Sequence, residues 1–192
     1  MSKRLVTEAV AFALIGTLFE TQFLVKNVPY IYESSSVIPA VPRAFGFVII
    51  ILTGYSLWMT LFGMQVGKAR TKFRDLAEKA GEQDLERYTY PNLYVFGTSD
   101  NAKGVNNAQR AHQHVLETMT QMFFATLISG TALPLTTSVS TFLWAWGRIG
   151  WSKAYLQHGH SERYTHFLST WIWRGLLINF LLSFITACSF LS

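Results

Sequence analysis

Three stretches of the chain carry no charged residue, and they dominate its pattern of hydrophobic and polar positions. Residues 44–67 form 24 uncharged positions, residues 118–147 form 30, and residues 175–192 form 18. A helix needs about 20 apolar residues to cross a bilayer core. Because backbone polar groups in lipid must be hydrogen-bonded within the protein, stretches of this length predict an all-α integral membrane protein.

The second of these stretches is too long for a single span. It contains the sequence TALPLTTS at residues 131–138, where a proline among small polar residues is typical of a tight turn between two helices. The pattern therefore predicts a four-helix transmembrane bundle over residues 43–192. We expect its helices near residues 43–68, 107–132, 136–157 and 165–191.

The segment before this bundle, residues 1–42, has a weaker pattern. Glu8 and Glu20 enclose only 11 uncharged positions, too few for an unbroken span. This extra N-terminal helical segment either lies in the membrane interface or crosses as a fifth, peripheral helix with its glutamates covered by protein. Residues 27–42 contain three prolines, so we expect an extended linker there.

The distribution of basic residues predicts the orientation. Eight Lys or Arg residues fall within residues 68–110 and three within residues 148–163, whereas residues 131–138 hold none. Loops rich in Lys and Arg stay on the cytosolic side of a membrane. We therefore expect the first and third loops of the bundle to face the cytosol, or the matrix of a mitochondrion. The predicted location is the endoplasmic reticulum membrane or a mitochondrial membrane.

Composition agrees with this class and limits the partners. Apolar residues make up 50% of the chain and charged residues 14%, against about 25% charged residues in a soluble domain. The net charge of +5 arises mainly from the basic loops. Basic residues beside a membrane usually meet anionic lipid headgroups, so we expect membrane lipids as partners and no nucleic acid.

Polar residues recur at helical spacing in the second and third predicted helices. At 100° per residue, Arg110, His114 and Glu117 fall on one face of the second helix. Arg148 and Tyr155 share a face of the third helix, with Trp151 at its flank. Because the two helices are antiparallel neighbours, both faces converge near the cytosolic end. The spacing predicts a cationic cleft with aromatic walls and one carboxylate.

This cleft has two interpretations. Guanidinium groups bind carboxylates in pairs of hydrogen bonds, and Glu117 offers a partner for an amine, so the cleft suits a small anionic ligand. Alternatively, Arg110, Glu117 and Arg148 form a buried ion network that fixes the register of the helices. A metal site is not expected, because side chains two apart on a helix, such as His112 and His114, diverge.

Four segments carry a resemblance to a known family. They read KARTKF at residues 68–73, YPNLY at 90–94, VNNAQRAHQHVLE at 105–117 and GRIGWSKAYLQHGHSER at 147–163. In this order and spacing they resemble the MAPEG family of membrane glutathione enzymes, and in particular its microsomal glutathione S-transferase type 3 branch. The resemblance covers roughly residues 43–191.

The resemblance implies a homotrimer of four-helix subunits that binds glutathione, its cosubstrate, between neighbouring subunits on the cytosolic side. Arg163 lies where the type 3 branch has the arginine that stabilises the thiolate, which makes it the expected catalytic residue. The activity implied is transfer of glutathione to a lipophilic substrate, or reduction of a lipid hydroperoxide. The positions matched to glutathione binding are Arg110, His114, Glu117, Arg148, Trp151, Tyr155, Arg70 and Arg74.

A second interpretation keeps the fold and drops the catalysis. His114 stands where the family pattern has Asn, and Trp151 where it has Tyr. Residues 75–88 look like an insertion, and residues 1–42 exceed the usual lead-in. These departures are also typical of a catalytically silent accessory or scaffold subunit, which would assemble with unlike membrane subunits in a larger complex.

Overall fold

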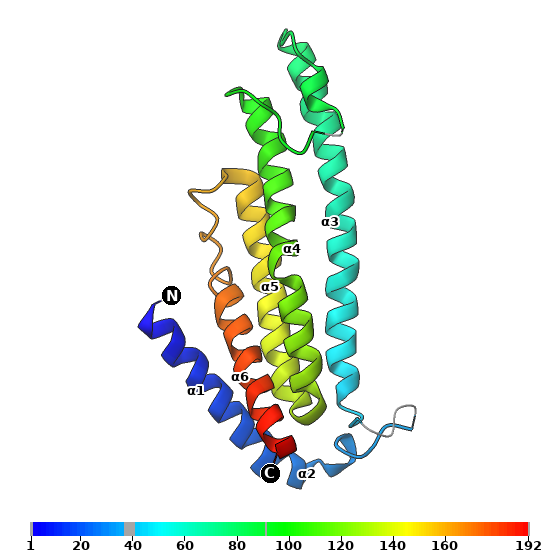
Figure 1. Cartoon of the computed structure of the whole chain (residues 1–192), viewed down its shortest axis with the longest axis vertical. Helices are drawn as coiled ribbons and strands as arrows, with labels where there is room; N and C mark the ends of the chain where they lie inside the picture. The colour runs from blue at the N-terminus through cyan, green and yellow to red at the C-terminus, as the bar shows by residue number, and fades with distance from the viewer. Residues whose placement is uncertain (1, 37–40, 91, 192) are drawn as a thin grey trace.

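The computed structural model describes residues 2–36, 41–90 and 92–191, and within these ranges it contains helices and no extended strand. Four long helices, α3 to α6, form an up-and-down bundle (Figure 1). The predicted all-α bundle is therefore confirmed. Its helices are α3 (Phe45–Lys79), α4 (Asp100–Ala132), α5 (Pro134–His158) and α6 (Trp171–Leu191).

The turn between α4 and α5 lies where the sequence predicts it. Leu133 alone separates the two helices, and Pro134 occupies the first turn of α5, where its missing N–H leaves no hydrogen bond unmade. Three other boundaries were predicted wrongly. α3 continues to Lys79 instead of ending near residue 68, and α4 begins at Asp100 instead of near residue 107. α6 begins at Trp171 instead of residue 165, because residues 159–170 form turns.

The extended end of α3 belongs to a small lobe, residues 68–106, that projects beyond the rest of the bundle at the top of Figure 1. We call it the extrinsic lobe. Its own apolar core contains Ala77, Tyr88, Val95, Ala102 and Val105. This core explains why α3 continues past the charged residues, since stopping at residue 68 would remove Ala77 from contact with Tyr88.

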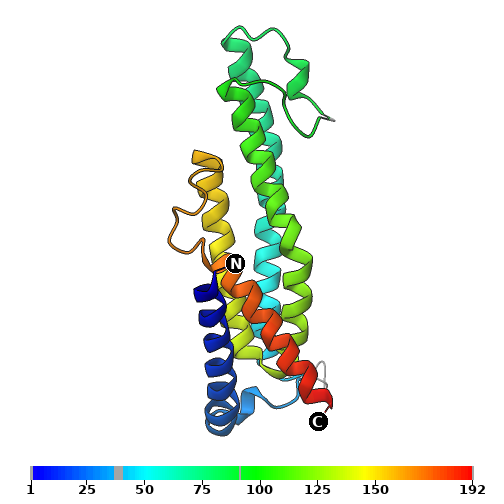
Figure 2. The same ribbon diagram turned by 60° about the vertical axis from the view of Figure 1, so that its left-hand side comes forward.

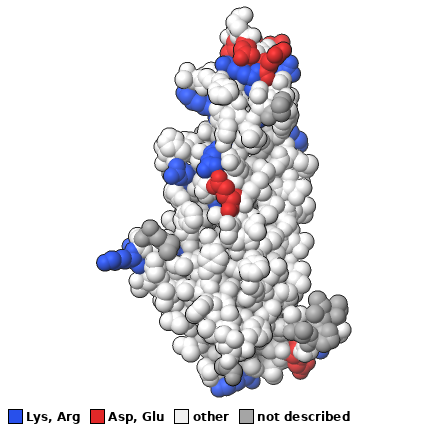
Figure 3. Space-filling view, in the orientation of Figure 1, with Lys and Arg blue, Asp and Glu red and all other residues white. Residues whose placement is uncertain are grey.

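Charged side chains gather over the extrinsic lobe at the top of Figure 3. The lower flank of the bundle is white in the same view, apart from the N-terminal end of the chain at the left and a small group at the base. An uncharged flank between two charged ends is what a bilayer requires of a bundle that crosses it.

The N-terminal segment forms a helix that packs against α6 (Figure 1), and Figure 2 shows the two helices close together near the start of α6 and separating toward its C-terminal end. It comprises α1 (Lys3–Phe19), a π-helical turn at Glu20–Leu24 and the short α2 (Val25–Asn27). Among the described residues, three helical segments are long and apolar enough to cross a membrane, namely Lys3–Asn27, Phe45–Lys79 and Trp171–Leu191. The N-terminal segment is therefore a fifth helix of membrane-spanning length. Residues 37–40 of the predicted linker lie outside the described part of the chain.

The two glutamates that interrupt the N-terminal apolar run attach this helix to the bundle. Near one end, Glu8 accepts a hydrogen bond of 2.6 Å from Nε of Arg174 on α6. Near the other end, Glu20 has no exposed surface. Its carboxylate accepts the backbone N–H groups of Leu135 at 2.9 Å and Thr136 at 2.8 Å. Glu20 therefore caps the N-terminus of α5 from a distant part of the chain.

Polar contacts also join the helices inside the bundle. Asn179 on α6 donates through Nδ2 to Oγ of Ser140 on α5 at 2.7 Å. Thr141 on α5 contacts Thr126 on α4, with their hydroxyl oxygens 3.1 Å apart. In hydrocarbon such contacts hold helices together because the alternative is an unsatisfied polar group. They also lower the hydropathy of α4 and α5, which is why neither ranks among the three candidate spans.

Candidate ligand-binding site

A polar cavity of about 260 Å³ opens among residues near the start of α4 and the end of α5, in the half of the bundle nearer the extrinsic lobe. Side chains of α4, α5, α6 and the turns at 159–170 form its walls. The lining residues are Arg110, His114, Trp151, Tyr155, Arg163, Tyr164 and Trp173. Five of the predicted site residues thus meet in one place, at the convergence of α4 and α5 that their spacing predicts.

Arg148 lies directly behind this cavity and has no exposed surface. Its Nη1 is 2.7 Å from Nδ1 of His114, and its Nη2 donates to the hydroxyl of Thr118. Its Nε makes no hydrogen bond, and no carboxylate in the described part of the chain pairs with it. A buried guanidinium with only neutral partners is costly, so the cavity beside it favours an anion.

The contact with Arg148 fixes the proton on His114. A guanidinium has no acceptor, so Nδ1 of His114 must accept, and the neutral ring then carries its proton on Nε2. The imidazole also stacks on Trp151, with ring centroids 4.3 Å apart and planes 23° apart. The ring centroid of Trp151 in turn lies 5.0 Å from that of Tyr155. These contacts form a fixed aromatic wall with a hydrogen-bond donor at its centre.

Arg110 and Glu117 form an ion pair at the edge of the cavity. Nη1 of Arg110 is 2.7 Å from Oε1 of Glu117, and both side chains are partly exposed, at 38% and 42%. The pair confirms that the two residues share one face of α4, two turns apart. Neither side chain is buried, so the pair can open at little cost. A ligand carboxylate can then take the place of Glu117 beside Arg110, and a ligand amine the place of Arg110 beside Glu117.

Arg163 reaches the cavity from the turns between α5 and α6. Its Nη1 donates to the backbone carbonyl of His160 at 2.9 Å, and its guanidinium lies 5.5 Å from the ring centre of Tyr164. These contacts leave Arg163 among the residues that line the cavity. It is the second guanidinium that lines the cavity, after Arg110, and Arg148 lies behind the wall.

Arg70 and Arg74 lie outside this cavity. Arg70 is 4% exposed, and it donates to the carbonyl oxygens of Tyr88, Thr89 and Leu93 at 3.3–3.5 Å. Within this chain it therefore holds the loop of the extrinsic lobe. Arg74 is exposed on the part of α3 that belongs to the same lobe.

Sequence reasoning missed Thr118, Tyr164 and Trp173. Thr118 lies one helical turn beyond His114, so extending the polar face of α4 by one position would have found it. Tyr164 and Trp173 come from the turns and the start of α6, where no helical periodicity links them to the cavity. The described residues contain no group of three or more His, Cys, Asp or Glu side chains that could hold a metal ion.

Comparisons with known proteins gave one match. The sequence model of the MAPEG family matches residues 48–185. The match covers α4 and α5 completely and most of α3 and α6, and therefore includes nearly every element around the cavity. No curated protein and no solved structure matches the chain.

Proposed function

Because the chain belongs to the MAPEG family, we propose that its polar cavity binds glutathione and that the protein is a membrane glutathione transferase or peroxidase. The observation that carries this proposal is Arg148, a fully buried guanidinium with neutral partners beside the cavity. The guanidinium groups of Arg110 and Arg163 line the cavity, and Arg148 and the carboxylate of Glu117 lie next to its lining residues. Glutathione offers the complement, with two carboxylates, one ammonium group and a thiol that ionises.

The partly exposed pair at the edge suits the two ends of a glutamyl group. On binding, the ion pair between Arg110 and Glu117 opens. Arg110 then binds a carboxylate of glutathione, and Glu117 binds its ammonium group. The Nε2–H of His114 is available to a second acceptor on the ligand. Tyr155 and Trp151 supply apolar surface for the peptide backbone, and Arg148 contributes its positive charge from behind the wall.

Arg163 is the residue we assign to the chemical step. A free thiol has a pKa near 8.5, so most of it is protonated at neutral pH. A guanidinium beside the sulfur favours the thiolate, which is the nucleophile, and the displaced proton leaves through the open cavity to water. Arg163 is suited to this because it is held by a backbone carbonyl and not by a carboxylate.

Two reactions use such a thiolate. In a transferase reaction the sulfur forms a bond to an electrophilic carbon of a lipophilic substrate, and a leaving group departs with the electrons of its bond; where the substrate is a conjugated alkene, the double bond opens instead and its far carbon takes a proton from water. In a peroxidase reaction the thiolate attacks the terminal oxygen of a lipid hydroperoxide, releasing the lipid alcohol and glutathione sulfenic acid. A second glutathione then reduces the sulfenic acid to the disulfide and water. The substrate in both cases partitions into the bilayer that surrounds the helices.

A homotrimer with glutathione between neighbouring subunits is part of the proposal. The cavity of about 260 Å³ within one chain is small beside the roughly 300–1,000 Å³ of ligand pockets, which supports a site that a neighbouring subunit enlarges. Arg74 is exposed on α3 and does not belong to the apolar core of the extrinsic lobe. Its position suits a contact with glutathione bound at a neighbouring subunit. The extrinsic lobe faces the cytosol or matrix, in the endoplasmic reticulum or a mitochondrial membrane.

The test is a glutathione titration of the purified protein in detergent, followed by thiolate absorbance. We expect a saturable signal and conjugation of a generic aromatic electrophile. Arg163→Ala should lower turnover at saturating glutathione by about tenfold or more, as expected for loss of one charge-assisted hydrogen bond. Arg43→Ala, at the other end of the bundle, is the matched control. No saturable thiolate signal and no conjugation would contradict the enzyme proposal.

A catalytically silent scaffold subunit is the second candidate, and two observations favour it. The fifth helix is clamped to the bundle by Glu8 and Glu20, and Arg110 and Glu117 neutralise one another without a ligand. Native mass spectrometry of the complex extracted from its membrane separates the two candidates. Three copies of this chain support the enzyme, whereas one copy among unlike subunits supports the scaffold.

A further inference from the structure

The N-terminal helix and α6 enclose a crevice that is separate from the polar cavity. It measures about 200 Å³ and lies between α1, the outermost helix at the left of Figure 1, and the first two turns of α6. We call it the α1–α6 crevice. Since α1 packs mainly against α6, the crevice lies at the periphery of the bundle, where lipid surrounds the helices. Its lining residues are Glu8, Ala9, Phe12, Trp171, Arg174 and Ile178.

Both helices pass from charged to uncharged sequence at the level of this crevice. Glu8 is the last charged residue of α1 before 11 uncharged positions, and Arg174 is the last before the 18 uncharged positions of residues 175–192. At 1.5 Å per residue, 18 residues span about 27 Å, close to the roughly 30 Å of a hydrocarbon core. The uncharged part of α6 is therefore only just long enough to cross, so Arg174 lies at the edge of the core, beside the lipid headgroups.

Two guanidinium groups share one carboxylate at this edge. Oε1 of Glu8 is 2.8 Å from Nε of Arg4, and Oε2 of Glu8 is 2.6 Å from Nε of Arg174. The cluster thus has one positive charge in excess. The side chain of Arg4 is 86% exposed, and among the described residues only its Nε has a hydrogen-bond partner. Its two Nη groups are therefore available to a phosphate, which guanidinium groups bind through paired hydrogen bonds.

Aromatic rings connect this charged edge with the apolar interior of the crevice. The guanidinium carbon of Arg174 lies 5.9 Å from the ring centre of Trp171, and the ring of Phe12 meets Trp171 edge-on with the centroids 6.3 Å apart. Tryptophan is enriched at the level of lipid headgroups, because its ring is apolar and its N–H is polar. Beyond it, Ala9, Phe12 and Ile178 have no polar side-chain atom. The crevice thus has a cationic mouth and an apolar interior, the order in which a phospholipid presents its phosphate and its acyl chains.

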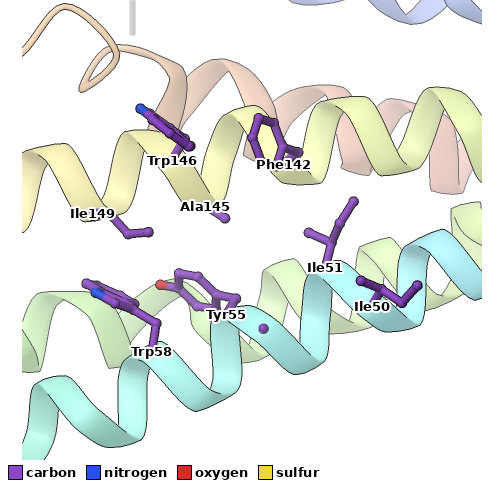
Figure 4. Close-up of a pocket in the computed structure, with 9 residues that line it drawn as sticks. Ile50, Ile51, Tyr55, Trp58, Phe142, Ala145, Trp146 and Ile149 are labelled. Carbon is purple, nitrogen blue, oxygen red and sulfur yellow. The ribbon is translucent and has the colours of Figure 1, made fainter.

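The apolar cavity between α3 and α5 has no such mouth (Figure 4). It measures about 330 Å³, and its lining consists mostly of isoleucine and aromatic side chains and contains no charged residue. Lipid tails that reach it therefore meet no group that distinguishes one headgroup from another. This cavity serves as an internal reference for the α1–α6 crevice.

We propose that the α1–α6 crevice binds an anionic phospholipid, with the phosphate on Arg4 beside Arg174 and the first carbons of one acyl chain against Phe12. An anionic headgroup neutralises the excess positive charge, whereas the ammonium group of a zwitterionic headgroup is repelled by it. The crevice is smaller than the roughly 300–1,000 Å³ of pockets that enclose a whole ligand, so the rest of the chain lies in the bilayer.

The orientation of the bundle agrees with this occupant. The distribution of basic residues directs the crevice toward the leaflet on the cytosolic or matrix side, where basic pockets between membrane helices bind anionic headgroups. The site is independent of glutathione, since no residue lines both the crevice and the polar cavity.

The experiment compares two photoreactive lipids that differ only in the headgroup. Phosphatidylglycerol and phosphatidylcholine, each with a diazirine near the ester end of one acyl chain, are added in turn at the same small fraction to phosphatidylcholine nanodiscs that contain the full chain. Mass spectrometry locates the labelled residues after illumination. We expect phosphatidylglycerol to label residues 5–12 and 171–178 about 5-fold more than phosphatidylcholine does, the factor that one basic residue at a membrane surface contributes. Residues 142–149, at the cavity between α3 and α5, should be labelled equally by both.

Two neighbouring basic residues provide the variant and its matched control. Arg4 shares the face of α1 that carries Glu8 and Phe12, whereas Lys3 lies about 100° around the helix. Arg4→Gln should lower the preference for phosphatidylglycerol about 5-fold, and Lys3→Gln should leave it unchanged. Both substitutions remove one positive charge from the exposed first turn of α1 and keep the ion pair between Glu8 and Arg174, so the helix stays attached to the bundle.

Three results would overturn the proposal. One is equal labelling of the crevice by the two lipids. Another is an equal loss in Lys3→Gln and Arg4→Gln, which would indicate diffuse attraction to a basic surface. The third is loss of phosphatidylglycerol labelling when inorganic phosphate is added in excess at constant ionic strength, which would make the crevice a site for free anions. Glutathione binding is measured on the same samples, so its absence alongside crevice labelling contradicts the proposed enzyme and not this site.

Discussion

At the scale of the residue, Arg148 is the position where stability and ligand binding conflict. Its guanidinium is fully buried, and the groups that accept its hydrogen bonds, the His114 ring and the Thr118 hydroxyl, are neutral. Burying a charge without a counter-ion costs several kcal/mol of folding free energy. Arg148 therefore does not stabilise the fold when no ligand is bound. The charge is therefore better explained by what binds beside it than by the packing of α4 against α5.

We therefore predict opposite effects of Arg148→Met on stability and on binding. The thermal unfolding temperature without ligand should stay the same or rise, because an apolar side chain replaces a desolvated charge. Glutathione affinity should fall by about 10- to 150-fold, which corresponds to about 1.5–3 kcal/mol for interactions with a charged group. Thermal shift with and without glutathione measures both. A large loss of stability with unchanged affinity would instead make Arg148 a register-fixing residue. Arg43→Met is the exposed control.

The extrinsic lobe contains the residue with the clearest pH dependence. The pKa of Glu82 is held at about 2, first by the amide of Asn101, then by the hydroxyl of Tyr88 and by Arg87. The carboxylate thus stabilises the folded lobe above its ordinary pKa of 4.5, and this contribution is lost as the pH falls from 4.5 toward 2. We predict that amides of residues 81–99 lose protection between about pH 6 and about pH 3.

Hydrogen exchange with mass spectrometry, corrected for the intrinsic pH dependence of exchange, measures this loss. Glu82→Gln imitates the protonated carboxyl group. In that variant the lobe should exchange faster already at about pH 6, and the change toward about pH 3 should disappear. Equal pH dependence in both proteins would assign the effect to another carboxylate.

The residues of the site show what spacing can and cannot predict. Arg110, His114 and Glu117 follow helical periodicity, so their common face could be predicted from position alone. The partners of Arg70 are carbonyl oxygens 18 to 23 residues away in a loop, and no periodic rule reaches them. Tyr164 and Trp173 depend on how the turns at 159–170 fold back over the cavity. Local periodicity therefore predicts one wall of the site, and tertiary structure supplies the other.

At the scale of the element, the N-terminal helix is held by its polar residues and not by its apolar face alone. Leu14, Ile15 and Leu18 are each more than half exposed, which leaves them to the lipid. The attachment near the linker is Glu20, which accepts two backbone N–H groups of α5 and the hydroxyl of Tyr32 at 3.0 Å. The charge of Glu20, which interrupts the apolar run of the N-terminal helix, is therefore what attaches this helix to α5.

Glu20→Ala should therefore destabilise the bundle at the α5 end. The substitution leaves two buried N–H groups without an acceptor and removes a negative charge from a helix N-terminus. We predict a loss of about 1–3 kcal/mol, measured by thermal unfolding in detergent. Faster proteolysis within residues 28–44 should accompany it. Glu33→Ala is the control, because Glu33 is 59% exposed and its nearest guanidinium nitrogen on Arg43 is 3.5 Å away, so its loss should cost under about 0.5 kcal/mol.

Helix ends were harder to predict than helix positions, for a physical reason. The apolar stretches fix where each helix crosses the membrane, because the bilayer sets their length. Outside the bilayer α3 continues to Lys79 because Ala77 packs into the extrinsic lobe, and it ends before Gly81, whose positive φ of 74° is typical of a helix C-terminus. Likewise the sequence at 165–170 is compatible with helix, and the turn before Trp171 depends on contacts such as that of the Leu168 N–H with His166 Nδ1, at 3.3 Å.

At the scale of the whole molecule, the five long helices define two ends that must face opposite sides of a membrane. The start of α1 lies beside the start of α6, as the pairing of Glu8 with Arg174 requires, and the end of the N-terminal helix lies beside the start of α5. The turns at 159–170 precede α6, so they and the N-terminus share one end, while residues 28–36 lie at the other (Figure 2). The basic residues at the start of α1 thus lie at the same end as the basic loops, which agrees with a fifth crossing.

Labelling of single cysteines tests this arrangement. With Cys188 replaced by Ser, Lys103→Cys and Ser161→Cys should react with a membrane-impermeant maleimide from the same side of sealed vesicles. Glu33→Cys should react only when the vesicles are opened or inverted, because the crossing of α3 places it on the far side. Ser2→Cys, at the start of α1, tests the N-terminal helix and should react from the same side as Lys103→Cys. Reaction of Ser2→Cys only in opened or inverted vesicles would mean that the N-terminal helix lies along the surface. In that case its contacts with α5 and α6 must form outside the hydrocarbon, and both Glu8 and Glu20 would meet water and not lipid.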